Sequence, residues 1–285
     1  MGRLPIFLAL VAVSCLAQPA TTPQQTYPDW AKAETNIPYD KYKDTVLDIA
    51  HPKEGFKGKR PGVVVLHGGG WIQSNKESAI RTLCLPYLER GFVVANVEYR
   101  VAKVATAPGA VTDTLMAIEW FRKNAGRYNV DPNRIVVTGA SAGGHLALIA
   151  GMAPKSAKLG PVAKVAAVIN CYGIPDVADV LDGPHRQDWA VQWVPEQPGR
   201  MELARRVSPL TYVRKNVPPI LTLHGEADTT APYEQAVKLT KALQAAGADA
   251  ELISVPKAGH GFSQAAWVGL NEQVFAFLKA RGVLR

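Results

Sequence analysis

The sequence predicts an α/β fold: a mostly parallel, twisted sheet with helices on both faces and a small cap insertion. Continuous runs of apolar β-formers, typical of strands buried on both faces, occupy residues 62–66, 92–97, 135–138, 165–170, 220–223 and 252–255. Helix-like segments, such as 113–124 and 232–246, alternate with these runs. Repeated strand–helix units favour parallel strands joined by right-handed crossovers. The length of 285 residues suits one such domain.

The N-terminal 17 residues are predicted to be a signal peptide. Arg3 supplies a positive start, and an apolar run at 6–13, too short to span a bilayer, is followed by small residues. We expect cleavage after Ala17 and a secreted or periplasmic protein. The alternative is lipidation of Cys15, which would anchor the protein to a membrane.

The folded domain is expected over residues 44–285. Residues 18–43 are predicted to form a linker and N-terminal extension, because Pro, Thr and Gln are frequent in the first part of this segment. An antiparallel edge strand is expected at 45–49, where apolar and polar residues partly alternate. At about 174–216 several prolines interrupt the strand–helix rhythm, and we expect this stretch to form a cap over the site.

The composition, 47% apolar and 20% charged, is that of an ordinary globular protein. The net charge of +8 is compatible with an acidic polysaccharide or an anionic surface as a partner, or with solubility alone. No basic run or aromatic platform indicates nucleic acid, and no Cys/His cluster has metal-ligand spacing, so neither nucleic acid nor a cofactor is expected. Cys84 and Cys171 fall in separate elements and are expected to be buried free thiols.

Residues 139–143 have the sequence Gly-Ala-Ser-Ala-Gly and lie between a strand-like run and a helix-like run. Strand, Gly-x-Ser-x-Gly and helix in this order are typical of a tight turn that exposes a nucleophilic serine. A side chain in place of either glycine would collide with the neighbouring strand or helix. The pattern therefore predicts Ser141 as a nucleophile.

A serine hydroxyl needs a base, and the base needs an orienting acid. In folds of this kind the acid and then the base follow the nucleophile along the chain. Asp228 comes just after the strand at 220–223, and His260 just after the strand at 252–255. The carboxyl edge of a parallel sheet is where ligands collect. We predict His260 as the base and Asp228 as the acid, with Glu226 on the same turn as the alternative acid.

A glycine-rich loop with the sequence His-Gly-Gly-Gly-Trp follows the strand at 62–66. Glycines expose backbone N–H groups that can point at the oxygen that becomes negative during acyl transfer. The backbone N–H groups of Gly69, Gly70 and Ala142 are the predicted donors. His67 is expected to form a hydrogen bond that fixes the shape of the loop.

Three tryptophans are candidate substrate-binding residues: Trp71, Trp189 and Trp193. Trp71 either stacks on a sugar or an aromatic acyl group, or wedges the glycine-rich loop into the core. Trp189 and Trp193 lie in the expected cap. His145, one helical turn after the nucleophile, is expected to pack rather than react.

These motifs resemble those of α/β-hydrolases in the esterase/lipase group, and most of all the feruloyl/acetyl-xylan esterase branch known as BD-FAE. The similarity covers residue 44 to the C-terminus. The motifs that carry it lie at residues 67–71, 98–100, 131–135, 139–145, 224–228 and 259–262.

The resemblance implies a secreted serine carboxylesterase that acts through an acyl-enzyme. Its expected substrates are small-molecule esters with short acyl groups, or the feruloyl and acetyl esters of plant polysaccharide. The alternatives are a formamidase or a small prolyl-oligopeptidase-like amide hydrolase, and a hydrolase-fold binding module without catalysis.

Overall fold

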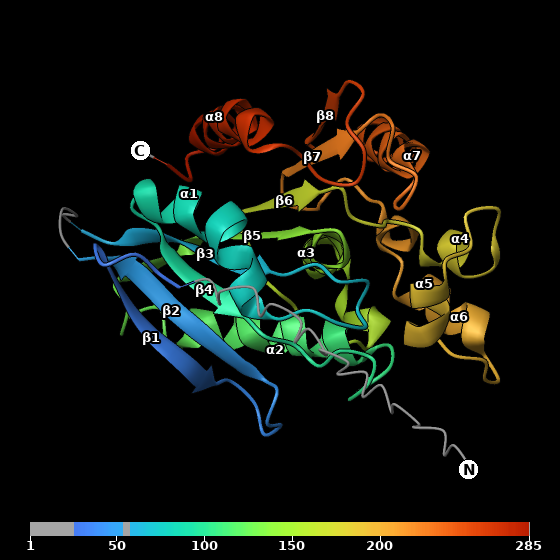
Figure 1. Ribbon diagram of the computed structural model, residues 1–285, viewed down its shortest axis with the longest axis horizontal. Helices are drawn as coiled ribbons and strands as arrows, with labels where there is room; N and C mark the ends of the chain where they lie inside the picture. The colour runs from blue at the N-terminus through green and yellow to red at the C-terminus, as the bar shows by residue number, and fades with distance from the viewer. Residues whose placement is uncertain (1–25, 54–57, 285) are drawn as a thin grey trace, which may run out of the picture.

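A twisted sheet forms the centre of the computed structural model, which describes residues 26–53 and 58–284 (Figure 1). The predicted signal peptide, its cleavage site and Cys15 therefore lie outside the described residues. Within them the sheet has eight strands: β1 (Ala31–Pro38), β2 (Val46–Pro52), β3 (Arg60–Leu66), β4 (Val93–Val97), β5 (Val130–Ala140), β6 (Ala167–Cys171), β7 (Ile220–Gly225) and β8 (Ala250–Val255).

The strand order is β1-β2-β4-β3-β5-β6-β7-β8. In this order, the six strands from β4 through β3 to β8 are parallel to one another, whereas β2 runs antiparallel to both β1 and β4. The expectation of a mostly parallel sheet is confirmed. The carboxyl ends of β3, β5, β6, β7 and β8 consequently meet at one edge of the sheet.

The N-terminal part of the sheet requires a correction. The strand expected at the edge, 45–49, is β2, and it is covered by β1, which the sequence did not predict. Half of the residues of β1 are polar, and only Ala31 is buried, as an outermost strand permits. The extension predicted for 18–43 therefore contributes a strand to the domain.

Alternate residues of the central strands face two separate cores. In β3, Val64 and Leu66 belong to one hydrophobic cluster, whereas Val63 and Val65 belong to the other. All four side chains are fully buried, because helices cover both faces of the sheet.

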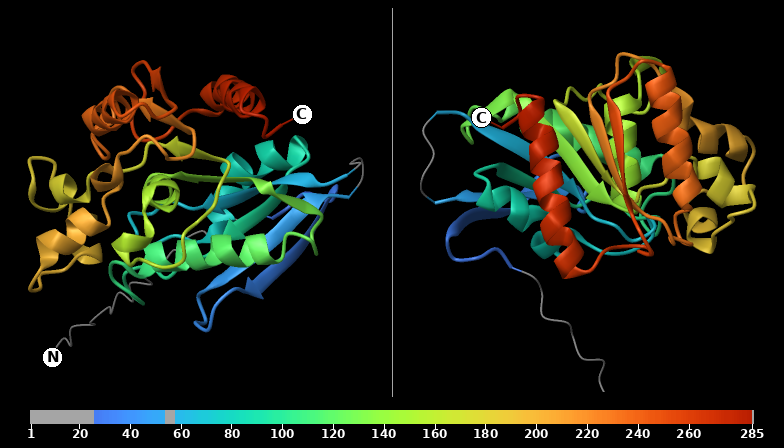
Figure 2. Two further views of the ribbon diagram at one scale, coloured as in Figure 1. Left: turned by 180° about the vertical axis from the view of Figure 1, so that it is seen from behind. Right: turned by 90° about the horizontal axis from the view of Figure 1, so that it is seen from above.

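The first face is covered by α2 (Gly109–Lys123), α3 (Ala142–Met152) and α7 (Tyr233–Ala245), and the second by α1 (Leu85–Glu89) and α8 (Gln264–Ala280) (Figure 2). Every residue of α3 is buried. This helix packs against β5 and β6. The turn between β5 and α3 is therefore fixed by the strand before it and by the packed helix after it.

The insertion between β6 and β7 contains α4 (Val177–Asp182), α5 (Asp188–Trp193), α6 (Arg200–Arg206) and the 3-10 turn η4 (Pro209–Tyr212). The three helices lie together at the end of the molecule away from β1 and β2 (Figure 1). They correspond to the cap expected at about 174–216. Buried residues of this segment, such as Val180 and Ala204, join the core cluster that contains α2 and α3.

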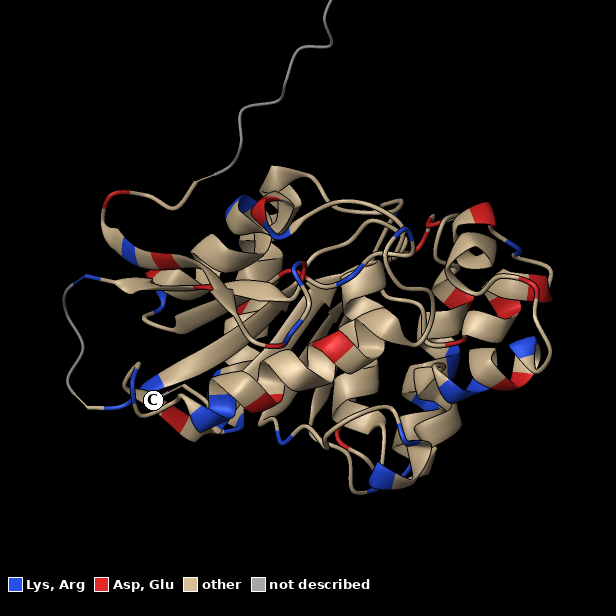
Figure 3. Ribbon diagram, turned by 90° about the horizontal axis from the view of Figure 1, so that it is seen from below, with Lys and Arg blue, Asp and Glu red and all other residues tan. Residues whose placement is uncertain are grey.

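Charged residues of both signs are interspersed on the face that Figure 3 shows. The net charge of +8 is therefore not gathered into one basic stretch on that face. Over residues 26–53 and 58–284, no helix combines the length and the apolar character that crossing a membrane requires.

Candidate active site

Ser141 occupies the turn between β5 and α3 in a conformation that side chains rarely adopt, with φ 56° and ψ −119°. Its N–H donates a 2.9 Å hydrogen bond to the carbonyl of Cys171. A Cβ on Gly143 would lie 2.1 Å from the carbonyl oxygen of Leu66, and one on Gly139 would lie 2.4 Å from Gly143. The glycines therefore allow β3 and α3 to approach closely enough for the serine to protrude.

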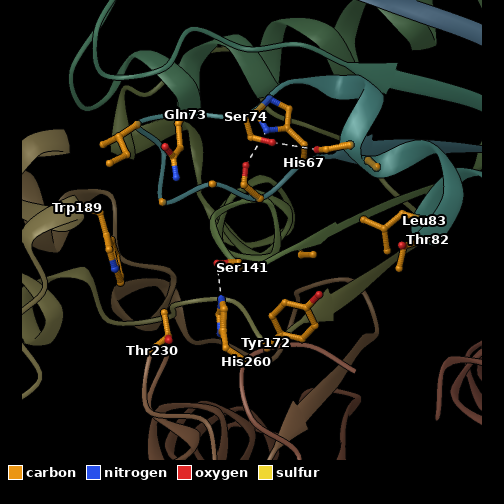
Figure 4. A pocket seen from close by; sticks show the side chains of 17 residues that line it. His67, Gln73, Ser74, Thr82, Leu83, Ser141, Tyr172, Trp189, Thr230 and His260 are labelled. Atoms are coloured by element: carbon orange, nitrogen blue, oxygen red, sulfur yellow. Dashed lines mark hydrogen bonds between the residues drawn. The ribbon is translucent and has the colours of Figure 1, made fainter. Parts of the chain in front are cut away.

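The side chains of Ser141, His260 and Asp228 form one hydrogen-bonded row, of which Figure 4 shows Ser141 and His260. His260 Nε2 lies 2.8 Å from Ser141 Oγ, and His260 Nδ1 lies 2.8 Å from Asp228 Oδ2. An ionised carboxylate only accepts, so Nδ1 carries the hydrogen and Nε2 is left free to accept from the serine hydroxyl. The three residues follow β5, β7 and β8, as the sequence predicts.

The carboxylate of Asp228 is fully buried and surrounded by donors. The N–H groups of Thr230 and Ala231 each donate to Oδ1 at 2.9 Å, and His224 Nε2 lies 3.3 Å from Oδ2. Burial by itself would raise the pKa of Asp228, but the hydrogen bonds from His224, His260 and Ala231 outweigh it and lower the pKa below 3.8. Asp228 is consequently ionised at neutral pH.

The alternative acid does not reach the imidazole. Glu226 is exposed, and the oxygen that contacts His260 belongs to Asp228. His224 contacts both Asp228 and the carbonyl of Ala231, the latter at 2.8 Å, and so steadies the turn that carries Asp228.

The glycine-rich loop lies opposite the imidazole, across Ser141 (Figure 4). Gly69 has φ +114°, and a Cβ there would lie 2.1 Å from the carbonyl of Gln73, so only glycine fits. Its own carbonyl accepts from Ile72 and Gln73, which closes the loop. Gly69 and Gly70 line the cavity beside Ser141. Ala142 is the first residue of α3, where backbone N–H groups have no intrahelical acceptor.

His67 supports the loop as expected. Its Nδ1 lies 2.7 Å from the carbonyl oxygen of Gly68, and its ring stacks on Tyr99 with centroids 4.1 Å apart. The Tyr99 hydroxyl donates to the carbonyl of His67 at 2.8 Å, and Nε2 lies 3.5 Å from Glu98. Arg100, which follows Tyr99, forms an ion pair with Asp113, at 2.6 Å between Nη2 and Oδ1.

Two of the three candidate substrate-binding tryptophans lie in the core: Trp193, contrary to the prediction, and Trp71, in the second of its two predicted positions. Trp71 and Trp193 are both 0% exposed and stack on each other with ring centroids 4.2 Å apart. Trp71 therefore wedges the loop into the core. Its indole N–H donates to His145 Nδ1 at 3.1 Å, so the hydrogen of His145 is on Nε2, which donates to the carbonyl of Val207 at 2.7 Å.

Trp189, on α5, is the one of the three that lines the cavity beside Ser141. A Cβ on Gly70 would lie 3.1 Å from the Trp189 side chain, so the cap touches the glycine-rich loop here. The cavity has a volume of about 460 Å³.

Tyr172 and Thr230 also line this cavity, and the sequence analysis did not identify them. The Tyr172 ring meets the His260 ring edge-on, with centroids 5.0 Å apart. Tyr172 follows β6 directly, so its position at the carboxyl edge of the sheet was the available signal.

Cys84 and Cys171 are free and buried, as expected. Burial raises the pKa of Cys171 to about 12 and that of Cys84 well above its usual range. Both thiols are therefore protonated at neutral pH and unreactive.

A mostly parallel sheet covered on both faces, with a serine on a strained turn between a central strand and a buried helix, defines an α/β-hydrolase fold. The comparison with protein families is more specific. The family described as BD-FAE matches residues 47–243, and this chain belongs to that family.

Similar proteins include esterase LipQ of Mycobacterium tuberculosis, 30% identical over 254 residues, which cover 84% of this chain and 59% of LipQ. Among solved structures, a truncated carbohydrate esterase from gut microbiota is 29% identical, with a TM-score of 0.76 over 90% of this chain and 99% of the other. Esterase 2 of the planctomycete Thermogutta terrifontis is 28% identical, with a TM-score of 0.75 over 92% of this chain and 97% of the other.

The chain spans 59%, 57% and 51% of the lengths of LipQ, LipC and LipM, three esterase-like relatives from the same organism.

Proposed function

We propose that the protein is a serine carboxylesterase that works through an acyl-enzyme. The observation that carries the proposal is the row Ser141–His260–Asp228, with both of its hydrogen bonds 2.8 Å long. The names of the similar proteins LipQ and esterase 2 of Thermogutta terrifontis point in the same direction.

In the first half of the reaction, His260 Nε2 takes the proton of the Ser141 hydroxyl as its oxygen attacks the ester carbonyl. Asp228 holds the imidazole through Nδ1 and stabilises its charged form. The oxyanion that develops is bound by the backbone N–H groups of Gly69, Gly70 and Ala142. The imidazolium then gives its proton to the departing alcohol oxygen, which leaves an acyl group on the serine.

In the second half, His260 takes a proton from water, and the resulting hydroxide attacks the acyl-serine. The same backbone N–H groups bind the second oxyanion. Collapse of this intermediate returns the proton to Ser141 and releases the carboxylic acid.

The proposed substrates are esters with short acyl groups, including the acetyl and feruloyl esters of plant polysaccharide. A cavity of about 460 Å³ beside Ser141, with Trp189 at one side and Tyr172 at the other, accommodates a small acyl group and part of its alcohol. Similarity to the carbohydrate esterase from gut microbiota supports an acylated glycan as the natural substrate.

Secretion is part of the proposal, because an acylated polysaccharide lies outside the cell. The support is the predicted signal peptide over residues 1–17. Sequencing the N-terminus of the exported protein tests it. A mature chain that begins near residue 18 supports free secretion, whereas a lipid-modified Cys15 supports anchoring.

A substrate panel tests the enzyme class. We expect hydrolysis of 4-nitrophenyl acetate and of acetylated xylan or methyl ferulate, and labelling of wild-type protein but not of Ser141→Ala by a fluorophosphonate. Turnover of N-formylkynurenine alone would instead indicate a formamidase, and turnover of prolyl 4-nitroanilide alone a peptidase. Failure to label at all would contradict a serine hydrolase.

A further inference from the structure

A second cavity, of about 500 Å³, lies beside the proposed active site, between the N-terminal part of α8 on one side and α1 with the segment that joins β3 to α1 on the other. The joining segment includes the π-helical turn η2 (Ile80–Cys84). The cavity combines an aromatic surface with polar groups, and its lining includes Arg81, Glu89, Phe262, Gln264, Trp267 and Asn271.

The two cavities share a lining residue. Thr82 lines both of them, and in Figure 4 Thr82, Leu83 and Tyr172 lie on one side of Ser141, with Trp189 on the other. The second cavity therefore extends the side of the site that lies away from the cap.

A row of aromatic rings connects the imidazole with the second cavity. The Tyr172 ring lies 5.0 Å from His260 and 5.2 Å from Phe262, and Phe262 lies 5.2 Å from Trp267, all measured between centroids. Each pair meets edge-on, so the rings hold one another in fixed orientations.

The chemistry of the proposed reaction decides which part of the substrate enters this cavity. The imidazole that protonates the leaving oxygen is His260, so the alcohol must depart from beside it. Phe262 follows His260 by two positions, and the aromatic row continues from His260 through Tyr172 and Phe262 to Trp267. An alcohol portion that follows this aromatic row from His260 reaches Trp267, which leaves the side of Trp189 to the acyl group.

The cavity presents the groups that a sugar ring requires. A pyranose has an apolar face that packs on an aromatic ring and a rim of hydroxyl groups that needs both donors and acceptors. Trp267 and Phe262 supply the aromatic surface, while Asn271 and Gln264 supply amides and Glu89 a carboxylate.

Hydrogen bonds within the protein fix the elements on the two sides of the second cavity. Trp267 lies in the first turn of α8, which Ser263 caps by accepting from the N–H of Ala266 at 3.2 Å. Arg81 Nη2 donates to Gln264 Oε1 at 2.8 Å, which links η2 to α8 across the cavity.

We propose that this second cavity binds a sugar ring of the glycan that carries the ester, with Trp267 as its stacking platform. The proposal rests on the esterase function proposed above and specifies its substrate: an ester on an oligosaccharide rather than on a small alcohol.

The test compares two substrates with the same acyl group, 4-nitrophenyl acetate and acetylated xylo-oligosaccharides. In Trp267→Ala, the ratio of kcat/KM for the oligosaccharide to kcat/KM for the nitrophenyl ester is expected to fall about three- to tenfold, from loss of one stacking contact. Asn271→Ala, which leaves the aromatic rings in place, is expected to lower the ratio about two- to threefold. The control is Trp30→Ala, an exposed tryptophan before the outermost strand β1, which lines neither cavity.

An unchanged ratio in both cavity variants would overturn the glycan site, as would a loss that appears with methyl ferulate and not with the oligosaccharide. Hydrolysis of 4-nitrophenyl acetate by wild-type protein tests the esterase function separately. If that activity is present and the ratio does not move, only the second cavity has been misassigned; if it is absent, the proposed function itself fails.

Discussion

At the scale of single residues, the position of Asp228 predicts a graded loss of activity. In Asp228→Asn, Oδ1 can still accept from Thr230 and Ala231, but an amide NH₂ faces His260 Nδ1 and favours the wrong tautomer. We expect kcat on 4-nitrophenyl acetate to fall about 10⁴-fold, and further, by about ten- to a hundredfold, in Ser141→Ala.

Glu226→Gln is the matched control, because Glu226 lies on the same turn and is exposed. Its kcat should remain within about twofold of wild type. A loss as large in Glu226→Gln as in Asp228→Asn would contradict the assignment of the acid.

The glycines of the turn at Ser141 give a second prediction at this scale. In Gly143→Ala, the new methyl group would lie 2.1 Å from the carbonyl of Leu66 and 2.5 Å from that of His67. Both neighbours are backbone and cannot move aside, so we expect a loss of at least about 2–3 kcal/mol in the free energy of unfolding. Urea denaturation measures it.

Gly126→Ala is the control for this substitution, since a Cβ at Gly126 meets nothing within 4 Å. We expect its free energy of unfolding to stay within about 0.5 kcal/mol of wild type. Equal effects of the two substitutions would show that the close approach of α3 to β3 is not what requires Gly143.

The roles of single residues could be predicted where motif spacing and order along the chain leave few candidates for each role. Ser141, Asp228 and His260 each follow a recognisable strand, and parallel strands bring their carboxyl ends together. The sequence could not decide whether Trp71 and Trp193 lie in the core or bind substrate, because an indole ring packs against apolar side chains as well as against a sugar ring. Phe262 and Trp267 acquire their position only from the packing of α8 against η2.

At the scale of elements, α8 offers a stabilising substitution. Gly269 lies within this helix, is exposed, and has open space where a Cβ would be. Gly269→Ala should raise the free energy of unfolding by about 0.5–1 kcal/mol, because glycine is the more flexible residue in the unfolded chain. Thermal unfolding should show a higher Tm.

Gly151→Ala, in α3, is the opposite case. The added Cβ would lie 2.4 Å from Val168 Cγ2, in a fully buried contact between α3 and β6. We expect this variant to unfold at a lower temperature. If both substitutions raised the Tm, intrinsic helix propensity alone would account for them.

The elements themselves were predictable to the extent that they are buried. β3 to β8 contain apolar runs and were expected, within two residues of their observed bounds except for β5, which begins five residues earlier than expected. β1 carries no such pattern, because its position at the edge needs few apolar side chains. Its pairing with β2 is a tertiary interaction that a local pattern does not reveal.

At the scale of the whole molecule, His145 predicts how stability depends on pH. Burial lowers its pKa from 6.5 to about 4. Between these values the unfolded chain binds a proton that the folded protein does not, so the free energy of unfolding decreases as the pH falls from 6.5 toward 4. The decrease is on the order of 3 kcal/mol.

His145→Gln should flatten this dependence, since a glutamine amide can accept from Trp71 and donate to Val207 without titrating. Chemical denaturation at several pH values between 4 and 6.5 measures the slope. Parallel slopes for wild type and His145→Gln would contradict the assignment.

The link Trp71–His145–Val207 ties together the glycine-rich loop, the helix after the nucleophile and the end of the cap segment. A hinged opening of the cap would have to separate two stacked, fully buried indoles and leave a buried imidazole without its partners. We therefore expect the cap to stay in contact with the glycine-rich loop, so that the fixed shape of the entrance selects the substrates. In such an enzyme we expect turnover to follow the reactivity of the ester instead of a slow opening step.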